Sequence, residues 1–406
     1  MQTNFNLENF IKTYITGRQE SLLAADFQKY NKELHHRINH KSVLVIGGAG
    51  SIGSNYIKAI LKFNIKKLVV VDINENGLTE LVRDLRSSEG YNIPGDFITY
   101  PVNFGDRVFE KIFKEHGPFE IVANFAAHKH VRSEKDIFSI EAMIENNVLR
   151  ARKLLDLLLE FPPEHFFCVS TDKAANPVNI MGASKKLMEE LIMAYSDKLP
   201  IKTARFANVA FSNGSLPLGF LERLNKKQPW SCPLGIRRFF VSPEESGELC
   251  LMASIMGESG DIFYPKLDEE RDMILFDKIA IDLISSLGYE ADICKTEEEA
   301  KQKALSLTPE SKKYPIYFFG SDTSGEKAFE EFFTQEEVLD EDSFIHLGVI
   351  KNSKKRNITE IGEILNNLET LFKKTTITKY EIVDALKVYL PNFAHIETGK
   401  GLDEKM

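Results

Sequence analysis

Cysteine is scarce in this sequence, and the spacing of the few that occur excludes the common zinc motifs. The 406 residues include four cysteines, none of them in a CxxC pair or in a Cys/His cluster with zinc spacing. They stand far apart, at Cys168, Cys232, Cys250 and Cys294. We therefore predict no metal site, and we expect reduced thiols in the core of a cytoplasmic protein.

Long apolar runs are also missing. No stretch approaches the ~20 apolar residues that span a bilayer, and the N-terminus lacks a basic segment followed by an apolar one. The formal net charge of -9 argues against a nucleic-acid surface. Because 43% of the residues are hydrophobic and 27% are charged, we expect a soluble globular protein without stable membrane insertion.

Apolar runs alternate with amphipathic stretches from residue 42 to about residue 210. Most of these runs are continuously apolar, as expected for parallel strands that are covered on both faces. We predict strands at SVLVIG, KKLVVVD, DFITYPV, FEIVANFA, HFFCVS and IKTARFA. We predict helices between them at 52–63, 77–87, 106–115, 138–161 and 181–197. This alternation is typical of an α/β fold with a Rossmann-like, doubly wound parallel sheet.

The remaining segments suggest additions to this sheet. Residues 1–40 have apolar residues at helical spacing and a break at Gly17, so we expect a helical N-terminal arm. The Rossmann-like domain is expected over 41–210, to which later parts of the chain can return. A smaller mixed α/β cap that binds substrate is expected over 211–345. A C-terminal helical extension should follow over 346–406, with helices near 358–371 and 379–388.

A glycine-rich turn follows the first predicted strand. The segment VLVIGGAGSIGS places Gly47, Gly50 and Gly53 between this strand and a helix that Ser51 and Ile52 open. Gly47 would permit the tight turn, Gly50 would let backbone N–H groups approach a pyrophosphate, and Gly53 would allow close packing of the helix. The pattern therefore predicts a dinucleotide-binding domain within residues 41–210.

An acidic residue ends the second predicted strand. A carboxylate at Asp72 would bind the hydroxyls of an adenosine ribose and repel a 2′-phosphate, so we expect NAD rather than NADP. Asp72 could also cap a helix. Asn103 stands where adenine would lie, and Ala126 and Ala127 offer small side chains beside the cofactor. Lys129 then lies at the mouth of the sheet, near a phosphate or simply in solvent.

A polar strip, STDK, ends the fifth predicted strand. Thr171, Asp172 and Lys173 should lie at the carboxyl edge of the sheet, where ligands bind in such folds. On the following helix, Met181 and Lys185 share one face. Lys185 could bind the nicotinamide ribose. Met181 lies four residues before Lys185, and a thioether cannot transfer a proton.

At these residues the chain resembles an extended short-chain dehydrogenase/reductase. STDKAANPVNIMGASK is similar to a segment of the UDP-N-acetylglucosamine 4,6-dehydratases of polysaccharide biosynthesis, in the branch that carries Met rather than Tyr. RFANVAFSNGS, RRFFVSPEESGEL and SGEKAFEEFF resemble further segments of that family. In the last of these, Thr323 and Ser324 replace the Arg and Pro of the family. The resemblance covers about residues 42–335.

The resemblance implies a reaction that suits these residues. Such enzymes oxidise the sugar at C4 by hydride transfer, eliminate water across C5 and C6, and return the hydride to C6. It implies that Lys173 is the base at C5 and that Asp172, buried in a closed cleft, is the acid at the C6 hydroxyl. A lysine base must lose its proton, so we expect burial or the charge of Lys185 to lower the pKa of Lys173.

The absence of the Tyr leaves one step open. The proton of the C4 hydroxyl could go to Thr171, to Lys185 or to a water held by Lys185. Met181 is expected to form a soft apolar wall against the sugar or nicotinamide. By the resemblance, Met at this place implies that the configuration at C5 is retained.

For the nucleotide sugar, the candidate binding residues are Asn208, Ser215 and Arg238, with the planar guanidinium of Arg238 on the pyrophosphate. Glu326 and Lys327 could contact the nucleotide or only cap a helix. Relatives that use a GDP-linked sugar would look similar. The resemblance also implies a homodimer or higher homo-oligomer, formed through the helices after the fourth and fifth strands.

Other functions compete with the dehydratase. A nucleotide-sugar epimerase or reductase of the same fold would usually need the missing Tyr. A non-catalytic sensor that binds a dinucleotide would have no reason to keep Asp172, Lys173 and Lys185 together. In the plainest alternative, Asp172 and Lys173 form only a surface ion pair.

Overall fold

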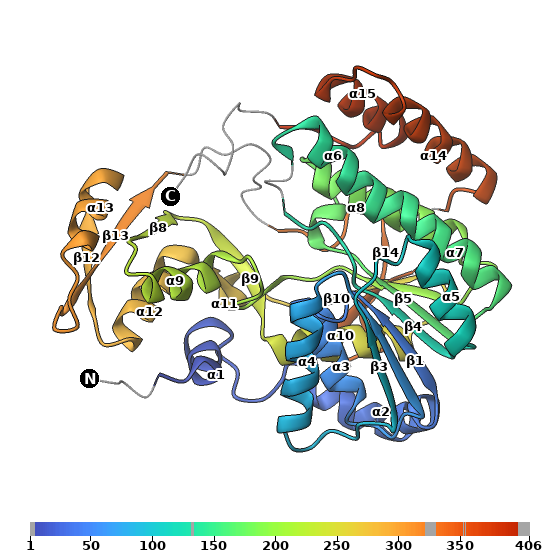
Figure 1. The fold of residues 1–406 in the computed structure, drawn as a ribbon, viewed down its shortest axis with the longest axis horizontal. Coiled ribbons are helices and arrows are strands. Elements are labelled where there is room, and N and C mark those ends of the chain that lie inside the picture. The colour runs from blue at the N-terminus through green and yellow to red at the C-terminus, as the bar shows by residue number, and fades with distance from the viewer. Residues whose placement is uncertain (1–4, 131–133, 321–329, 352, 354, 397–406) are drawn as a thin grey trace.

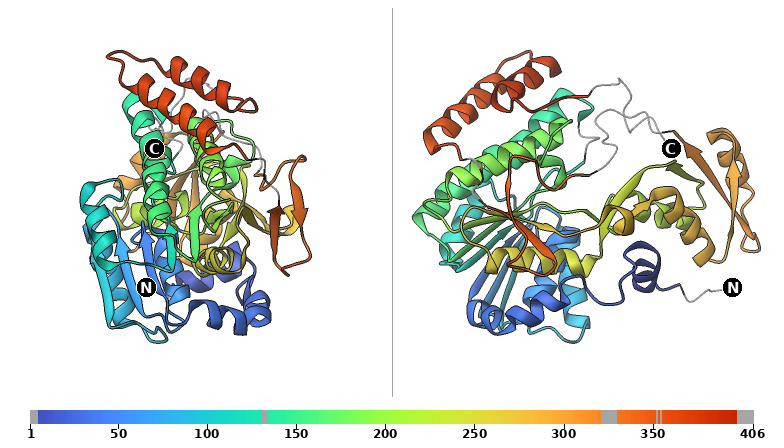
Figure 2. Two further views of the ribbon diagram at one scale, coloured as in Figure 1. Left: turned by 90° about the vertical axis from the view of Figure 1, so that its right-hand side faces the viewer. Right: turned by 180° about the vertical axis from the view of Figure 1, so that it is seen from behind.

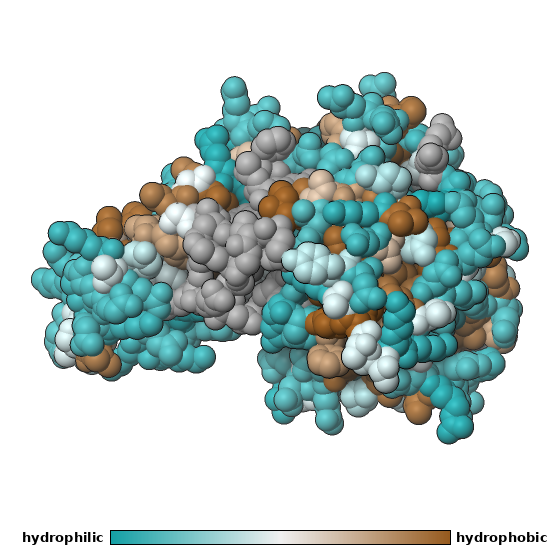
Figure 3. All heavy atoms as spheres, turned by 90° about the horizontal axis from the view of Figure 1, so that it is seen from above, coloured by the Kyte–Doolittle hydropathy of each residue, from teal (hydrophilic) through white to brown (hydrophobic). Residues whose placement is uncertain are grey.

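The computed structural model describes residues 5–130, 134–320, 330–351, 353 and 355–396. Two lobes of unequal size make up the molecule, and Figure 1 shows the larger one built around a single sheet. From above, hydrophilic residues cover most of the visible face, and hydrophobic residues form scattered patches (Figure 3). The sequence positions Thr323, Ser324, Glu326 and Lys327 lie outside the described residues.

A nine-stranded sheet forms the centre of the larger lobe, in the order β14-β15-β10-β6-β5-β4-β1-β2-β3. All six predicted strands form: β1 (Ser42–Ile46), β2 (Lys67–Val71), β3 (Asp96–Tyr100), β4 (Ile121–Asn124), β5 (His165–Val169) and β6 (Ile201–Ala204). They pair in parallel, with Val45 of β1 opposite Val70 on one side and Ala123 on the other. Successive strands are added toward one edge from β1 to β3 and toward the other edge from β4 to β6. Sheets of this type open a ligand crevice at the point between β1 and β4 where the order changes direction.

Later parts of the chain extend the sheet beyond β6. These strands are β10 (Asp261–Pro265), β14 (Val338–Asp340) and β15 (Leu347–Lys351). β10 is parallel to β6, β15 is antiparallel to β10, and β14 is antiparallel to β15. The range 211–345, expected to be the cap, is therefore interrupted by a return of the chain to the main sheet.

Helices cover both faces of this sheet (Figure 2). They are α3 (Ser51–Ile60), α4 (Glu75–Ser87), α5 (Arg107–His116), α6 (Ile137–Ile144), the π-helical turn η3 (Glu145–Leu149), α7 (Arg150–Glu160), α8 (Ile180–Ala194) and α10 (Pro243–Met256). α10 begins with a capping box of Ser242 and Glu245. Gly247 lets α10 pack on α3, since a Cβ there would lie 2.2 Å from the carbonyl oxygen of Asn55. The predicted Rossmann-like architecture is confirmed.

The smaller lobe contains two three-stranded sheets. One has the order β11-β9-β7 and the other the order β12-β13-β8. Their strands are β7 (Asn208–Val209), β8 (Trp230–Pro233), β9 (Arg237–Val241), β11 (Met273–Leu275), β12 (Glu290–Cys294) and β13 (Lys313–Phe319). The helices are α9 (Leu216–Asn225), α11 (Glu269–Asp272), α12 (Phe276–Ser286) and α13 (Glu297–Leu305). Trp230, stacked on Phe220, lies at the centre of its core.

The N-terminal arm connects the two lobes. It consists of α1 (Leu7–Phe10), the π-helical turn η1 (Ile11–Ile15) and α2 (Ala24–Ile38). Gly17 separates the two helical parts with a φ of 65°, as the predicted break requires. Ile11 packs into the core of the smaller lobe and Leu34 into that of the larger one. Between them, Arg18 forms ion pairs with Glu245 and Asp272.

The C-terminal extension forms the two predicted helices, α14 (Ile358–Phe372) and α15 (Lys379–Tyr389). α14 packs on α8, and Arg356 joins them through an ion pair of 2.6 Å to Glu190. Arg152 of α7 also bonds Asn366 of α14, at 3.0 Å. The extension thus covers part of the helical face through which dimerisation was expected, and the oligomeric state stays a prediction.

The prediction of core thiols is met within the described residues. All four cysteines are buried and have free thiols. Histidine, cysteine and acidic residues do not gather anywhere in this part of the chain into a group that could hold a metal ion. Over the same residues, each helix is too short or too polar to cross a bilayer.

Candidate active site

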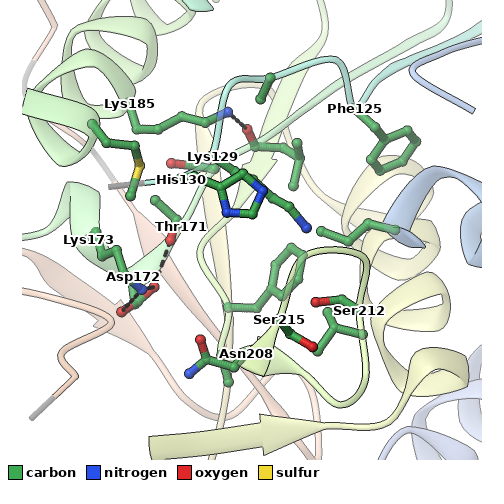
Figure 4. Close-up of a pocket in the computed structure, with 18 of the residues that line it drawn as sticks. Phe125, Lys129, His130, Thr171, Asp172, Lys173, Lys185, Asn208, Ser212 and Ser215 are labelled. Carbon is green, nitrogen blue, oxygen red and sulfur yellow. Dashed lines mark hydrogen bonds and ion pairs between the residues drawn. The ribbon is translucent and has the colours of Figure 1, made fainter. Parts of the chain in front are cut away.

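Two neighbouring cavities lie at the carboxyl ends of the central strands. One, of about 220 Å³, surrounds the glycine-rich turn between β1 and α3. The other, of about 250 Å³, surrounds the polar strip after β5 (Figure 4). Asn213, from the loop that leads into the smaller lobe, lines both. The two cavities therefore form adjoining parts of one cleft between the lobes.

The glycine-rich turn has the tight backbone that the sequence predicted. Gly47 has a φ of 76°, and a Cβ on it would lie 2.5 Å from the backbone nitrogen of Ala126. A Cβ on Gly53 would lie 2.3 Å from the carbonyl oxygen of Gly47. At Gly50, by contrast, a Cβ would meet that oxygen at an ordinary 3.4 Å. Packing within the protein therefore explains Gly47 and Gly53 but does not require glycine at position 50.

Asp72 holds the turn in place through its carboxylate. It accepts hydrogen bonds of 2.9 Å from the backbone N–H groups of Ala49 and Asn74. The cap of α4 is Asn74, whose side chain accepts the N–H of Gly77, so the reading of Asp72 as a helix cap is wrong.

Asp72 also lines the first cavity, together with most of the residues predicted to bind the cofactor. These are Gly47, Gly50, Asn103, Ala126 and Ala127. Ile52 lines the second cavity instead, and the Ser51 hydroxyl accepts the backbone N–H of Asn213 at 2.8 Å. The close backbone, the small side chains and the carboxylate suit the groups of a dinucleotide.

The polar strip after β5 brings three functional side chains together. Asp172 and Lys173 lie in a short 3-10 helix, η4 (Asp172–Ala174), directly after the strand. The Thr171 hydroxyl donates to Asp172 Oδ1 at 2.6 Å, and Lys173 Nζ donates to both carboxylate oxygens, at 3.1 and 3.2 Å. Figure 4 shows this pair among the residues that line the second cavity. Asp172 is only 3% exposed, so the pair is not a surface ion pair.

Sequence reasoning missed a second carboxylate at this site, that of Glu330. The side chain is buried and accepts hydrogen bonds from Asn208 Nδ2, at 2.6 Å, and from the backbone N–H of Phe239, at 2.9 Å. Its Oε1 lies 4.0 Å from Lys173 Nζ and 3.7 Å from Arg238 Nε. The two adjacent glutamates of SGEKAFEEFF are visible in the sequence. No sequence pattern indicated that the first of them, Glu330, lies close to the residues that follow β5.

The pKa of Glu330 is raised from its ordinary 4.5 to about 7, chiefly by burial and also by the negative charge of Asp172. Lys173, Arg238 and the N–H of Phe239 offset only part of this shift. Glu330 can therefore gain or lose a proton near neutral pH.

The protonation of Lys173 differs from the expectation. Burial lowers the pKa of Lys173, but the charges of Asp172 and Glu330 and the hydrogen bond to Asp172 outweigh burial, and the pKa is raised. The expected lowering by Lys185 was therefore wrong, because Lys173 faces two carboxylates. Lys173 is an ammonium group in this state of the protein.

The helix α8 carries Lys185 and Met181 to the same cavity. Lys185 is buried, and its Nζ donates to the carbonyl oxygen of Val169 at 3.0 Å. Burial lowers the pKa of Lys185, against the opposing effect of Cys168 and Glu189. Met181 is buried and lines the cavity, as expected of an apolar wall.

The predicted substrate residues lie in different surroundings. Asn208, Ser215 and Lys129 line the second cavity. Ser215 also caps α9, and Lys129 donates to the carbonyl oxygen of Asn213 at 3.0 Å. Arg238 is buried against Glu330 and is not among the residues that line this cavity. Its predicted contact with a pyrophosphate stays a prediction.

A comparison with protein families identifies the family of this chain. The family described as polysaccharide biosynthesis protein matches residues 43–352. The chain belongs to this family. Within this polysaccharide biosynthesis protein, the matched region contains both cavities and ends just after β15.

Three relatives extend the comparison. An uncharacterized membrane protein of Methanocaldococcus jannaschii is 32% identical, over 75% of this chain and 85% of its own length. The capsular polysaccharide biosynthesis protein CapD of Staphylococcus aureus is 27% identical over 89% of this chain. A UDP-glucose 4-epimerase of Rickettsia bellii is 30% identical, over 81% of this chain and 96% of its own length. The chain spans only 56% of the length of CapD.

One solved structure supports the fold of this polysaccharide biosynthesis protein. Pen from Bacillus thuringiensis matches with a TM-score of 0.62 and 20% identity, over 82% of this chain and 99% of that protein. At this level of identity the likeness concerns the fold alone.

Proposed function

We propose that this polysaccharide biosynthesis protein is an NAD-dependent nucleotide-sugar 4,6-dehydratase. It converts UDP-N-acetylglucosamine to a UDP-4-keto-6-deoxy-N-acetylhexosamine for surface glycan biosynthesis, although a GDP-linked sugar would suit the same site. The observation that carries the proposal is the ion pair of buried Asp172 and half-buried Lys173 in a cavity next to one that suits a dinucleotide. An epimerase needs no such acid and base beside the strand end.

The first cavity would hold NAD. Its adenosine ribose would lie against Asp72, and its pyrophosphate would lie at the N-terminus of α3, where Gly50 leaves the backbone accessible. Bound NAD takes up the hydride from C4 of the sugar and returns it to C6. Lys185 would bind the nicotinamide ribose from α8.

The hydrogen bond from Thr171 to Asp172 supports a route for the proton of the C4 hydroxyl. Its hydroxyl already donates to Asp172, so its oxygen can accept the proton of the sugar while its own proton passes to the carboxylate. Lys185 is turned toward the carbonyl oxygen of Val169. We therefore favour Thr171 over Lys185 as the group that replaces the missing Tyr. Asp172 gains a proton in this step.

Asp172 and Lys173 then divide the elimination between them. Lys173 takes the proton from C5, and the protonated Asp172 gives its proton to the departing C6 hydroxyl, which leaves as water. After the hydride has returned to C6, Lys173 gives its proton back to C5. Because the same group removes and returns this proton from one side, the configuration at C5 is retained.

Product mass tests the proposal. The purified protein is incubated with UDP-N-acetylglucosamine and, in parallel, with a GDP-linked hexose. We expect a nucleotide sugar that is lighter by one water, and we expect Asp172→Asn to form it far more slowly because an amide cannot supply the proton. Unchanged mass with both sugars would overturn the dehydratase.

An epimerase is the second candidate, since the relative from Rickettsia bellii is named a UDP-glucose 4-epimerase. It would leave the mass of the sugar unchanged and alter its NMR spectrum at C4. The same incubation therefore separates the two candidates.

A further inference from the structure

Lys173 cannot act as a base in the state that the structure shows. Its ammonium group is paired with Asp172, and a second carboxylate, that of Glu330, lies 4.0 Å away. A base at C5 needs a neutral amine with a free lone pair. Some group must therefore take a proton from Lys173 before C5 can be deprotonated.

The geometry around Glu330 suits this task. Its carboxylate is buried and lies close to Lys173, while Asn208 and the N–H of Phe239 hold its position. Among the residues that the structure describes, the titratable or charged groups that face it are Asp172 and Lys173 from η4 and Arg238 from β9. Glu330 is not among the residues that line the cavity, so it does not compete with the sugar for Lys173.

We propose that Glu330 is a positioning residue that takes the proton of the Lys173 ammonium group and so converts Lys173 into the C5 base. This inference rests on the proposed dehydratase function. It adds a group with no direct contact to the substrate, and it explains why the site holds two carboxylates beside one lysine.

The order of events follows from the contacts. When Asp172 receives the C4 proton through Thr171, it becomes neutral and no longer attracts the ammonium group of Lys173. A small rotation of the Lys173 side chain then brings Nζ to Glu330. One N–H bond of Lys173 breaks and one O–H bond of Glu330 forms, so the opposite charges cancel and no other reactant is needed. The proton returns to Lys173 after the C5 proton has been given back.

The test follows oxidation and elimination separately in Glu330→Gln. The full chain, loaded with NAD, receives UDP-N-acetylglucosamine in deuterated water. Absorbance of the reduced nicotinamide reports C4 oxidation, and product mass together with deuterium at C5 reports elimination. In Glu330→Gln we expect elimination to fall about 100-fold, in the range of a lost proton transfer. Oxidation should continue, so reduced cofactor should accumulate.

The pH profile gives a second readout. Because Glu330 must be ionised to accept the proton, the elimination rate of the unmodified protein should fall as the pH drops through about 7. Glu330→Gln should lose this dependence, and Glu330→Asp, which keeps a carboxylate, should restore part of the rate. Glu331→Gln is the matched control, because Glu331 bonds Asn176 instead, and its rates should equal those of the unmodified protein.

Each other outcome overturns a distinct claim. If Glu330→Gln eliminates at the normal rate, or loses oxidation and elimination in parallel, Glu330 does not receive the Lys173 proton. If the unmodified protein forms no dehydrated product, the proposed function fails and the role of Glu330 fails with it.

Discussion

Around the glycine-rich turn, the groups that shape the cavity belong mainly to one short segment and are fixed by backbone contacts. Gly47, Gly53 and Asp72 come from a single β-α-β unit and touch backbone atoms. Around the polar strip, Asp172, Lys173 and Glu330 are charged side chains that tertiary structure brings together. The first cavity therefore depends on local shape, whereas the second depends on protonation states that influence one another.

The largest expected effect is a loss of dehydration rate when Lys173, which lines the second cavity, is replaced. Lys173→Ala should lower dehydration by about 10²- to 10⁴-fold, because it removes the proposed base at C5. Cofactor binding should remain, since Lys173 lines only the second cavity. Initial rates and titration with NAD measure the two effects. Lys198→Ala, at an exposed position, is the control, and a Lys173→Ala protein that dehydrates normally would contradict the assignment.

Two glycines test the first cavity. Gly53→Ala should unfold the turn or abolish cofactor binding, because its Cβ would lie 2.3 Å from a backbone oxygen. Gly50→Ala should leave thermal stability within ~0.5 kcal/mol, yet weaken NAD binding if a pyrophosphate approaches this position. Thermal unfolding measures the stability of both variants, and calorimetric titration measures their affinity for NAD. Equal NAD affinity in Gly50→Ala and the unmodified protein would argue against the predicted place of the pyrophosphate.

Stability should depend on pH through Glu330. The folded protein holds its proton up to about pH 7, whereas the unfolded chain loses it near 4.5, so folding is disfavoured as the pH rises between these values. Glu330→Gln should therefore be more stable than the unmodified protein at pH 8, by up to about 3 kcal/mol, and nearly equal to it at pH 4. Denaturant unfolding at both pH values checks this. A gain that is the same at both would rule out the titration of Glu330 as its cause.

A smaller effect is expected at Asp72. Asp72→Asn should weaken NAD binding by about 1.5–3 kcal/mol and reduce the preference over NADP, because the charge that repels a 2′-phosphate is gone. The asparagine can keep only part of the contacts to Ala49 and Asn74. Parallel titrations with NAD and NADP measure the change. An unaltered ratio of the two affinities would place the ribose elsewhere.

The smallest effect is expected at Met181. Met181→Leu keeps an apolar side chain of similar volume, so stability should change by less than about 1.5 kcal/mol and activity only a few-fold. Comparison of its pH–rate profile with that of the unmodified protein is the check. A large loss of rate would mean that the thioether has a specific role.

The difference between the cavities also explains which parts of the candidate site could be predicted from the sequence. The turn at Gly47 and the acid at Asp72 were predictable because strand, turn and helix are contiguous and their periodicity is strong. Asp172 and Lys173 were predicted together because they are neighbours after one strand.

The rest depends on contacts between distant segments. Glu330 was missed, and the pKa of Lys173 was predicted in the wrong direction, for the same reason: the two carboxylates around Lys173 come together only in the folded chain. The return of α10 and β10 to the main sheet was not located either, because a buried helix and a short strand have the same pattern in either lobe.

Transfer of the C4 hydrogen tests the central claim most directly. UDP-N-acetylglucosamine that carries deuterium at C4 is converted, and the product is examined by NMR. The proposed dehydratase moves this deuterium to C6 of a product that has lost one water. Deuterium that remains at C4 of a sugar of unchanged mass would contradict it.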